Sequence, residues 1–517
     1  MRLDELPLLS VLILVPLVGA LVVWLLPAGS RSRARAVAVA VGLLEVAVAV
    51  AAVGAFDTTD AGTHQLTEAL PWIPAIGASY AVGVDGVGLL LVLLAVVLTP
   101  LVLLASGRAD AATPDRLRSY LALVLLLEAF MVAVFVARDV FLFYVLFEAM
   151  LVPVYFLIGL FGGAQRRYAA VKFLVFSLAG GLIMLVAVIA LYLQGPGGPD
   201  GFLTDNLTGL DLPVVTERLL FVAFFLAFAI KAPMWPVHTW LPDAAQNATA
   251  GTSTLLVGVL DKVGTFGMLT LCLPLFPAAS RWAAPVIIVL SVISVLYGAL
   301  LAIGQQDLMR LIAYTSVSHF GFIVLGIFAF TSVSVQGSSL YMVNHGLSTG
   351  ALFLTAGFLI ARRGTQRIAD YGGLQKVTPV LAGTFLVAGL SALSLPGLST
   401  FVSEFLVLVG TFARSGPAAV VAVIGVVLAA LYVLLTYQRL FTGPVRDELA
   451  GTRDLSARER WAVGPLIALM VVLGFYPAPM VDLVREPSLV TLDDVGVQDV
   501  PQREGLATSG DDEGSNT

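Results

Sequence analysis

Residues 221–244 read FVAFFLAFAIKAPMWPVHTWLPDA. The apolar run at the start of this stretch ends on Lys231, and three prolines follow, at positions 233, 236 and 242. Proline lacks the backbone donor that an α-helix needs, so it ends or kinks a helix. Transporters build ion sites beside broken transmembrane helices, because the freed backbone groups can line a wet cavity. The stretch therefore predicts a broken transmembrane helix with a lysine at the break.

The composition places this helix in a chain that is almost entirely a membrane domain. Of 517 residues, 59% are hydrophobic and 12% are charged, against roughly 25% charged residues in an ordinary soluble protein. The mean hydropathy is +0.96, and no stretch before the C-terminal tail has the composition of a soluble domain. The composition thus excludes a single anchor attached to a soluble catalytic domain.

The charged residues and the single cysteine exclude further classes. Lys and Arg number 28 against 34 Asp and Glu, a net charge of -6, so the chain lacks the basic surface that nucleic acid requires. Cys272 alone can build neither a disulfide nor a cysteine-ligated iron-sulfur cluster. His238 and Asp243 are too few ligands for a metal site, and we expect none. Any redox cofactor is therefore expected in a partner subunit.

Apolar runs along the chain predict the membrane spans. A helix needs about 20 apolar residues to cross roughly 30 Å of hydrocarbon. The fourteen candidate runs lie at 8–27, 36–56, 87–106, 118–137, 140–161, 170–193, 219–237, 252–275, 283–304, 308–330, 338–361, 379–413, 418–440 and 461–481. Arg31, Arg33 and Arg35 follow the first run in place of a small-residue cleavage site, so we interpret that run as a span. The predicted fold is an all-α polytopic membrane protein with about 14 transmembrane helices.

Lys and Arg are distributed unequally between the loops. Alternate loops hold 19 of them on one side and seven on the other. Short cytoplasmic loops carry the excess of Lys and Arg in membrane proteins. Both termini are therefore expected on the outer side of the membrane.

A second break interrupts the twelfth run. The sequence LSLPGLSTFVSEF at 393–405 places Ser394, Pro396 and Gly397 inside the run, and Glu404 follows. Spans 4 to 8 and 9 to 13 then form two sets of five, and the broken helix is the fourth in each set. Because five is an odd number, the second set enters the membrane from the opposite side, which predicts two repeats with inverted topology. The expected parts are spans 1 and 2 with an outer loop (1–85), span 3 (86–117), the two repeats (118–275 and 283–440), the last span (461–481) and a disordered acidic tail (482–517).

Several ionisable residues lie inside these apolar runs. A charge at the bilayer centre costs about 2.5 to 3.5 kcal/mol, so each one suggests a function. Only four lysines occur in the chain, and Lys231 and Lys262 both lie in apolar runs. Unlike arginine, a desolvated lysine can lose its proton. The other candidates for proton transfer are Glu148, His319, His345 and Glu404.

Structural roles stand as alternatives for some of these residues. Glu45 and Glu128 are interpreted as protonated acids that hydrogen-bond between helices, and they stay outside the predicted site. His319 and His345 have the right intrinsic pKa to relay protons, but each could merely hydrogen-bond a neighbouring helix. His238, beyond the first break, could equally be an ordinary loop histidine.

Five motifs resemble a known family. They are FEAMLVPVYFLIGLFG at 147–162, FAIKAPMWPVHTWLPDA at 228–244, LMRLIAYTSVSHFGF at 308–322, NHGLSTGALFL at 344–354 and LPGLSTFVSEFLVL at 395–408. Together they resemble the antiporter-like membrane subunits of respiratory complex I, over roughly residues 85 to 440. Among these subunits the chain is most similar to the M (ND4-like) type, because an acid, Glu404, follows the second break where the L and N types usually have lysine.

The resemblance implies roles for the candidate residues. It implies that Glu148 pairs with Lys231, that Lys262 is the central lysine, and that Glu404 is the terminal acid. His319 and His345 match the histidines of the family's central axis. After Asp243 the sequence AAQNATAGTS lacks the family's usual histidine and proline, and Asp261 stands where an apolar residue is common. His238, Asp243 and Asp261 are therefore possible residues of the proton uptake side.

The resemblance also implies a function. The chain is expected to be a proton-translocating subunit of a NADH:quinone oxidoreductase, with flavin, iron-sulfur clusters and quinone held by partner subunits. Expected partners are lipids and other membrane subunits, including the L and N chains. A D-type subunit of a multisubunit cation/proton antiporter is the first alternative. A passive membrane scaffold is the second, but it offers no reason for deprotonatable lysines inside spans.

Overall fold

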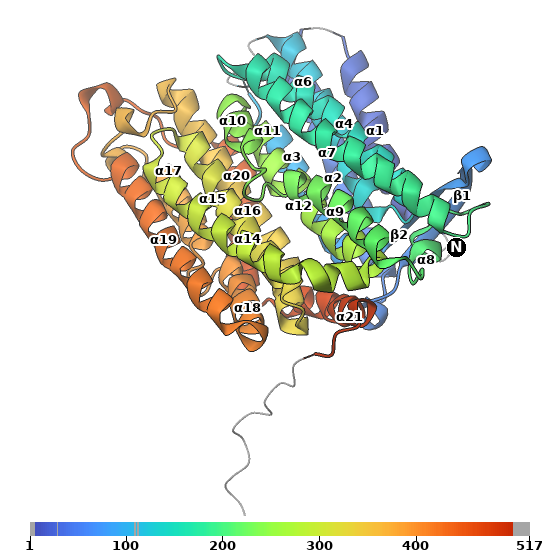
Figure 1. The fold of residues 1–517 in the computed structure, drawn as a ribbon. Helices are drawn as coiled ribbons and strands as arrows, with labels where there is room; N and C mark the ends of the chain where they lie inside the picture. Colours follow the sequence, from blue (N-terminus) through green and yellow to red (C-terminus); the bar gives the residue numbers. More distant parts are fainter. Residues whose placement is uncertain (1–5, 28, 108–109, 111–112, 500–517) are drawn as a thin grey trace, which may run out of the picture.

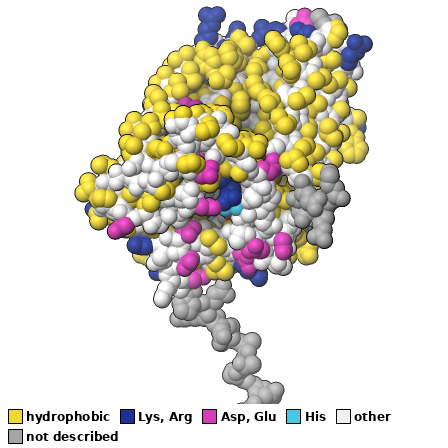
Figure 2. Space-filling view, turned by 90° about the vertical axis from the view of Figure 1, so that its right-hand side faces the viewer, with side chains coloured by type: hydrophobic (Ala, Val, Ile, Leu, Met, Phe, Trp, Pro, Cys, Tyr) yellow, Lys and Arg dark blue, Asp and Glu magenta, His cyan; other side chains and the backbone are white. Residues whose placement is uncertain are grey.

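The structure is a computed structural model, and it describes residues 6–27, 29–107, 110 and 113–499. Figure 1 shows long helices that lie side by side in one bundle, with short elements at its ends. In Figure 2 hydrophobic side chains cover much of the visible face, while Lys and Arg gather mainly at the upper end and Asp and Glu in the lower half. This distribution is typical of a bundle that crosses a lipid bilayer.

The helices follow the predicted order along the chain. The N-terminal part contains α1 (Leu8–Leu25), α2 (Arg31–Ala55) and α3 (Gly86–Ala105). The first expected repeat contains α4 (Pro114–Val136), α5 (Val140–Ala149), α6 (Leu151–Phe161), α7 (Arg166–Gln194), α8 (Thr204–Leu207), α9 (Val214–Lys231), α10 (Trp240–Asn247), α11 (Ala250–Leu255), α12 (Lys262–Gly267) and α13 (Leu273–Leu275). The second contains α14 (Pro277–Gly304), α15 (Leu308–Phe328), α16 (Ser332–Arg363), α17 (Pro379–Ala392), α18 (Ser399–Arg414) and α19 (Gly416–Phe441). The chain continues with α20 (Ala457–Phe475) and α21 (Ala478–Val495).

The helical class is confirmed, but the count of fourteen spans is not. Within the described ranges, eleven helical segments are long and apolar enough to cross a membrane, or twelve if the bent pair of α20 and α21 is one span. The predicted spans outside the eleven are those that contain α9, α17 with α18, and α20. Because of its break, the twelfth predicted span is divided into helices of 14 and 16 residues, each shorter than the roughly 20 residues that span a bilayer.

Both predicted breaks are present. Helix α9 ends at Lys231, and the next helix begins only at Trp240. Helix α17 ends at Ala392, and α18 begins at Ser399, five residues before Glu404. Each break therefore places an ionisable residue at or near a helix end, as the prolines in the sequence predicted.

The eighth span departs from regular α-helix on both sides of Lys262. Two π-helical segments, η4 (Leu256–Leu260) and η5 (Met268–Cys272), flank α12. Single π-helical turns change which backbone carbonyls are paired, and they are frequent at functional sites. The sequence contained no signal for them, since the run has no proline before position 274.

A β-hairpin lies in the predicted outer loop. Strands β1 (Gln65–Ile73) and β2 (Ala78–Val84) pair antiparallel. The carboxylate of Glu68 accepts hydrogen bonds from the backbone N–H groups of Leu9 and Ser10, at 3.0 and 3.1 Å. These bonds satisfy donors that the first turn of α1 leaves unpaired. The hairpin, which the sequence analysis did not predict, therefore fixes the start of the first span.

The prediction of a disordered tail from residue 482 is wrong for residues 482–495. These residues belong to α21, which bends by 70° from α20. Its buried side includes Met480, Val484 and Leu492, so the helix is amphipathic. A search for apolar runs misses such a helix, because only one of its faces is apolar and its average composition is polar. Residues 500–517 of the predicted tail lie outside the described residues.

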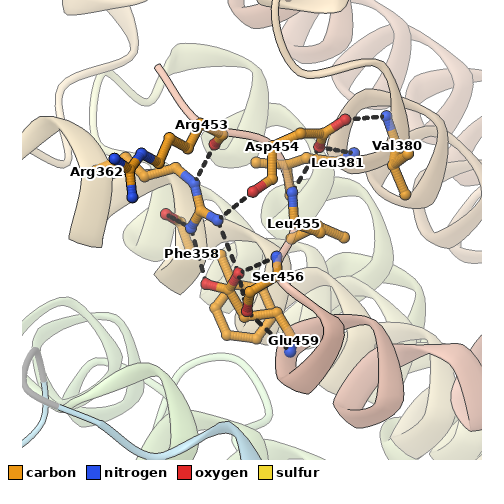
Figure 3. A network of polar contacts seen from close by, with 9 residues as sticks. All are labelled: Phe358, Arg362, Val380, Leu381, Arg453, Asp454, Leu455, Ser456 and Glu459. Carbon is orange, nitrogen blue, oxygen red and sulfur yellow. Dashed lines mark hydrogen bonds and ion pairs between the residues drawn. The ribbon is translucent and has the colours of Figure 1, made fainter. Parts of the chain in front are cut away.

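A polar network ties together the helices of the second half at one end of the bundle (Figure 3). The guanidinium of Arg362 on α16 donates two hydrogen bonds to the carboxylate of Glu459 on α20, at 2.9 and 2.7 Å. It also donates to the carbonyl oxygens of Arg453 and Asp454. The carboxylate of Asp454 accepts from two backbone N–H groups in the first turn of α17, at 2.8 and 2.9 Å. Such bidentate, charge-assisted bonds are strong, so the network holds α16, α17 and α20 together.

Candidate functional site

Lys231 is the last residue of α9, and it lies in an apolar setting. Its side chain is 1% exposed, and its Nζ has no hydrogen-bond partner within the described part of the chain. Nζ lies 5.0 Å from the ring centre of Phe147 and 5.7 Å from that of Phe173. Aromatic faces attract a cation more weakly than a carboxylate hydrogen bond does. Lys231 is therefore a buried amine without a direct counter-ion in contact.

Glu148 lies one residue before the end of α5. Its carboxylate is within electrostatic range of Lys231. Its Oε1 has no hydrogen-bond partner among the described residues, and it lies against Gly181 of α7, where an added Cβ would be 1.6 Å away. The structure thus brings the predicted pair together as charges acting through space, without a closed hydrogen-bonded ion pair.

Lys262 is held by the π-helical turn before it and by a histidine. Its Nζ donates to the carbonyl oxygen of Val257 and lies 2.7 Å from Nδ1 of His345. The ring centre of Phe320 is 4.9 Å from the same Nζ. Asp261, which directly precedes Lys262 in the chain, is completely buried, and both of its carboxylate oxygens lack a hydrogen-bond partner among the described residues.

The two predicted axis histidines lie next to each other. The ring centres of His319 on α15 and His345 on α16 are 5.2 Å apart. Nε2 of His345 lies 3.3 Å from the hydroxyl of Ser316, one turn before His319 on α15. Both imidazoles are at most 2% exposed. The structure therefore joins the residues that the sequence could only name separately.

Tyr341 connects the histidines to the terminal acid. Its hydroxyl lies 2.7 Å from Nδ1 of His319 and donates to Oε2 of Glu404 at 2.5 Å. Ser394 donates to the same carboxylate oxygen at 2.7 Å. The backbone of Ser394 has a φ of +61°, which is uncommon for a residue other than glycine. Strained residues cluster at functional sites, and here the strained serine lies in the break that precedes Glu404.

Sequence reasoning missed Tyr341 and Tyr432 as functional candidates. Tyr432 on α19 lies 3.3 Å from Nε2 of His319, so both ring nitrogens of this histidine face a phenol. One signal for Tyr341 was available, because it stands four residues before His345 and residues at this spacing share a helix face. Tyrosine is otherwise common in apolar runs and does not stand out there.

Of the three residues predicted for the uptake side, Asp243 and His238 both lie near Lys172, whereas Asp261 lies within electrostatic range of Lys231 and Lys262. Asp243 on α10 is partly exposed and pairs with Lys172 at 2.5 Å and with Arg310. Burial acts to raise the pKa of its carboxyl, but the hydrogen bonds from these two cations outweigh it and hold the pKa below its usual value. His238 is 2% exposed and packs edge-on against Tyr297, 5.1 Å away. Asp261, by contrast, lies beside Lys262 in the buried centre.

Glu45 on α2 and Glu128 on α4 were interpreted as hydrogen-bonding acids. Both are completely buried, and their carboxyl groups lie within hydrogen-bonding reach of each other, although none of the four oxygens makes a hydrogen bond of good geometry within the described ranges. The two carboxyl groups are within electrostatic range of each other.

In the described part of the chain, no group of three or more His, Cys, Asp or Glu could hold a metal ion.

Comparison with known proteins places the chain in a family. A family model described as "NADH:quinone oxidoreductase/Mrp antiporter, TM" matches residues 137–429, more than half of the chain. The "NADH-quinone oxidoreductase subunit M" of Mycobacterium tuberculosis (strain ATCC 25618 / H37Rv) is 50% identical over 532 residues, which cover 96% of each chain. The protein of the same name from Rhodobacter capsulatus is 38% identical, over 94% of this chain and 96% of that one.

Solved structures agree with this assignment. A chain of "Respiratory complex I from Thermus thermophilus with bound NADH" matches with a TM-score of 0.86 and 31% identity, over 94% of this chain and all of that one. A chain of the Mrp complex from Dietzia sp. DQ12-45-1b matches with a TM-score of 0.84 and 23% identity, over 96% and 100% of the two chains. At that identity the second match shows the fold alone.

The chain therefore belongs to the antiporter-like transmembrane family that NADH:quinone oxidoreductases share with Mrp antiporters. Within this family it is an M-type, proton-translocating membrane subunit of a NADH:quinone oxidoreductase. It works as one part of a multisubunit, multi-pass membrane complex.

Proposed function

We propose that protons cross this subunit along the row Glu148, Lys231, Lys262, His345, His319, Tyr341 and Glu404. The observation that carries the proposal is the hydrogen-bonded chain from His319 through Tyr341 to Glu404. The contact between Lys262 and His345 extends this chain toward the first break. From Lys231 to Glu404 the row runs through the buried interior, and these two residues lie at the two broken helices, where freed backbone groups can admit water. Glu148 is partly exposed.

In the first half of the path, Glu148 controls the protonation of Lys231. The carboxylate favours the charged amine, because opposite charges attract strongly where water is excluded. When the charge state of a neighbouring subunit weakens this attraction, a charged amine in an apolar site becomes costly. Lys231 then releases its proton, which passes by water to Lys262. Asp261 lies within electrostatic range of both lysines and stabilises the proton between them.

In the second half, the proton moves through the imidazoles to the terminal acid. Lys262 gives its proton toward Nδ1 of His345, and the adjacent His319 takes it up. Tyr341 donates its own hydroxyl proton to Glu404 and accepts one from His319, so the phenol is unchanged after the step. A hydroxyl can do this because it is donor and acceptor at once. Glu404 then releases one proton per cycle to the outer side.

The uptake side is assigned to the basic end of the bundle. The partly exposed Asp243 on α10 and His238 in the first break are assigned to the entrance, and Asp261 to the inner end of the route. The excess of Lys and Arg in the loops at this end favours a cytoplasmic position. Both termini then face the outer side of a bacterial inner membrane.

The chain is proposed to work without a redox centre of its own. It has one buried cysteine and supplies no ligand set for an iron-sulfur cluster, since such clusters need several cysteines. Flavin, clusters and quinone are assigned to partner subunits. The exposed apolar faces of its helices are assigned to lipid and to neighbouring membrane subunits, including the L and N chains.

Replacing Glu148 tests this proposal directly. Glu148→Ala removes the group that stabilises charged Lys231, and the complex should still assemble. Proton uptake by reconstituted vesicles should fall by about tenfold or more, and NADH:quinone reductase activity should fall with it if the two steps are tightly coupled. Wild-type pumping by a fully assembled Glu148→Ala complex would remove this residue from the path.

The alternative is a D-type subunit of a multisubunit cation/proton antiporter. Its support is the shared fold with the Mrp complex. The purified native complex distinguishes the two assignments. NADH-dependent quinone reduction with bound flavin and iron-sulfur absorbance supports the oxidoreductase, whereas sodium/proton exchange without these centres supports the antiporter.

A further inference from the structure

We infer that Gly181 on α7 is a positioning residue that seats the carboxylate of Glu148. The inference rests on the proposed role of Glu148 and deepens it. An ideal Cβ at Gly181 would lie 1.6 Å from Oε1, 2.5 Å from Cδ and 3.1 Å from Oε2 of Glu148. The carboxylate therefore occupies the space that any larger residue at position 181 would fill.

Gly181 belongs to a pair of adjacent glycines that face different helices. A Cβ at Gly180 would lie 3.0 Å from Cδ1 of Ile230 and 3.2 Å from Cα of Ala227, so Gly180 faces α9 close to Lys231. Gly181 instead faces the end of α5. Without side chains, the two glycines let α7 approach both helices closely. The space left by the missing side chain of Gly181, here called the notch, thus helps to set how Glu148 lies relative to Lys231.

Oε1 of this carboxylate is held by packing against Gly181 and not by a hydrogen bond. Oε1 of Glu148 has no hydrogen-bond partner among the described residues, and Lys231 acts on it only through space. The strength of that interaction depends on distance. To accommodate a Cβ at Gly181, the nearest approach must increase from 1.6 Å to at least 3.0 Å. A single methyl group would therefore displace the acid without removing it.

The substitution Gly181→Ala should affect function and leave folding intact. The three nearest atoms that the new Cβ meets all belong to the Glu148 side chain, and none is backbone. The end of a glutamate side chain can rotate away at little cost, and alanine favours a helix more than glycine does. A loss of activity in the assembled complex would therefore come from the displaced carboxylate.

The experiment compares glycine variants in the whole reconstituted complex. With Gly181→Ala we expect proton pumping and NADH:quinone reductase activity to fall about tenfold, since a displacement of about 1 Å at a reacting group can lower a rate by up to about 100-fold. Gly159→Ala on α6 is the matched control. There the new Cβ meets only Cβ of Ala170, at an ordinary 3.5 Å, and activity should be unchanged.

A second substitution separates positioning from a general defect in α7. Glu148→Asp shortens the side chain by one methylene and withdraws the carboxylate from the notch. Because this change also displaces the carboxylate, Glu148→Asp alone should lose pumping as Gly181→Ala does. The double variant should lose little more than either single variant, since both changes act through the same group. Wild-type pumping by Gly181→Ala, or losses that multiply in the double variant, overturns the positioning role while the path through Glu148 stands. Wild-type pumping by Glu148→Ala overturns the path itself, and the positioning role with it.

Discussion

The hydroxyl of Tyr341 donates to Oε2 of Glu404 at 2.5 Å while it lies 2.7 Å from Nδ1 of His319. The three residues come from α16, α18 and α15, so the Tyr341 hydroxyl connects side chains of three different helices. All three side chains are at most 4% exposed. A hydroxyl can both accept and donate a proton, and the phenol is the group that links the imidazole to the acid.

Tyr341→Phe should stall proton transfer while keeping the ring in place. The variant removes one hydroxyl, and it leaves a buried histidine nitrogen and a carboxylate oxygen without that partner. Such a loss corresponds to about 1 to 3 kcal/mol, and we expect proton pumping in reconstituted vesicles to fall about tenfold or more. NADH:quinone reductase activity, measured on the same preparation, should fall in parallel.

Tyr432→Phe is the control for that variant. Its hydroxyl lies 3.3 Å from Nε2 of His319, a longer contact that is a side branch of the proposed row. Pumping should fall less than with Tyr341→Phe. Equal losses in the two variants would mean that the hydroxyls serve only to orient His319, and the step through Tyr341 would be dropped.

Lys231→Arg should be nearly as damaging as Lys231→Ala. Arginine keeps the positive charge and can still attract Glu148, but a guanidinium holds its proton across the accessible pH range. If Lys231 works by releasing a proton, the arginine variant retains a fixed charge at the end of α9 and pumping stops. The measurement is proton uptake by vesicles that contain each variant, and full activity of Lys231→Arg would show that the residue is only a structural counter-ion.

Much of the fold was predictable from the sequence, because lipid imposes one strong rule. A chain in hydrocarbon must satisfy its backbone internally, so apolar runs predict helices and prolines within them predict breaks. The breaks after Lys231 and before Glu404 are both observed. This rule does not apply outside the bilayer, and there prediction failed: the strands of 65–84 and the helix of 478–495 have polar or mixed sequences.

The candidate site was predictable only in its charged members. Ionisable residues in apolar runs attract attention because burying a charge is costly, and this identified Glu148, Lys231, Lys262 and Glu404. Hydroxyl groups carry no such penalty, so Tyr341 looked like an ordinary core residue. The contact between His319 and His345 depends on how α15 and α16 face each other, which no spacing in the sequence specifies. Their roles in proton transfer stay predictions for the experiments above.

Asp243→Asn should destabilise the complex slightly at neutral pH. Hydrogen bonds from Lys172 and Arg310 lower the pKa of the Asp243 carboxyl in the folded protein, against the effect of its burial. A carboxyl with a lowered folded-state pKa stabilises the fold above its unfolded-state pKa, and this contribution is lost as the pH falls through the folded value. The ion pairs are partly exposed, so the effect should be at most about 1 kcal/mol.

Thermal unfolding of the purified complex as a function of pH checks this prediction. The difference between wild type and Asp243→Asn should be largest near pH 7 and should shrink below about pH 4, the usual range of an aspartate. Asp205→Asn is the control, because Asp205 is 59% exposed in its pair with Arg138 and should contribute almost nothing. A difference that grows as the pH falls would contradict the direction of the Asp243 shift.

Glu404 provides the sharpest test of whether the path needs a titratable group at its end. Glu404→Gln keeps the shape and can still accept from Tyr341 and Ser394, but it cannot carry a proton, so pumping should fall about tenfold or more. Glu404→Lys changes the charge but restores a group that can bind and release a proton. Partial pumping should therefore survive with lysine where it does not survive with glutamine. If vesicles with the two variants pump equally, Glu404 acts through packing and hydrogen bonding, and the proton leaves the subunit from another residue.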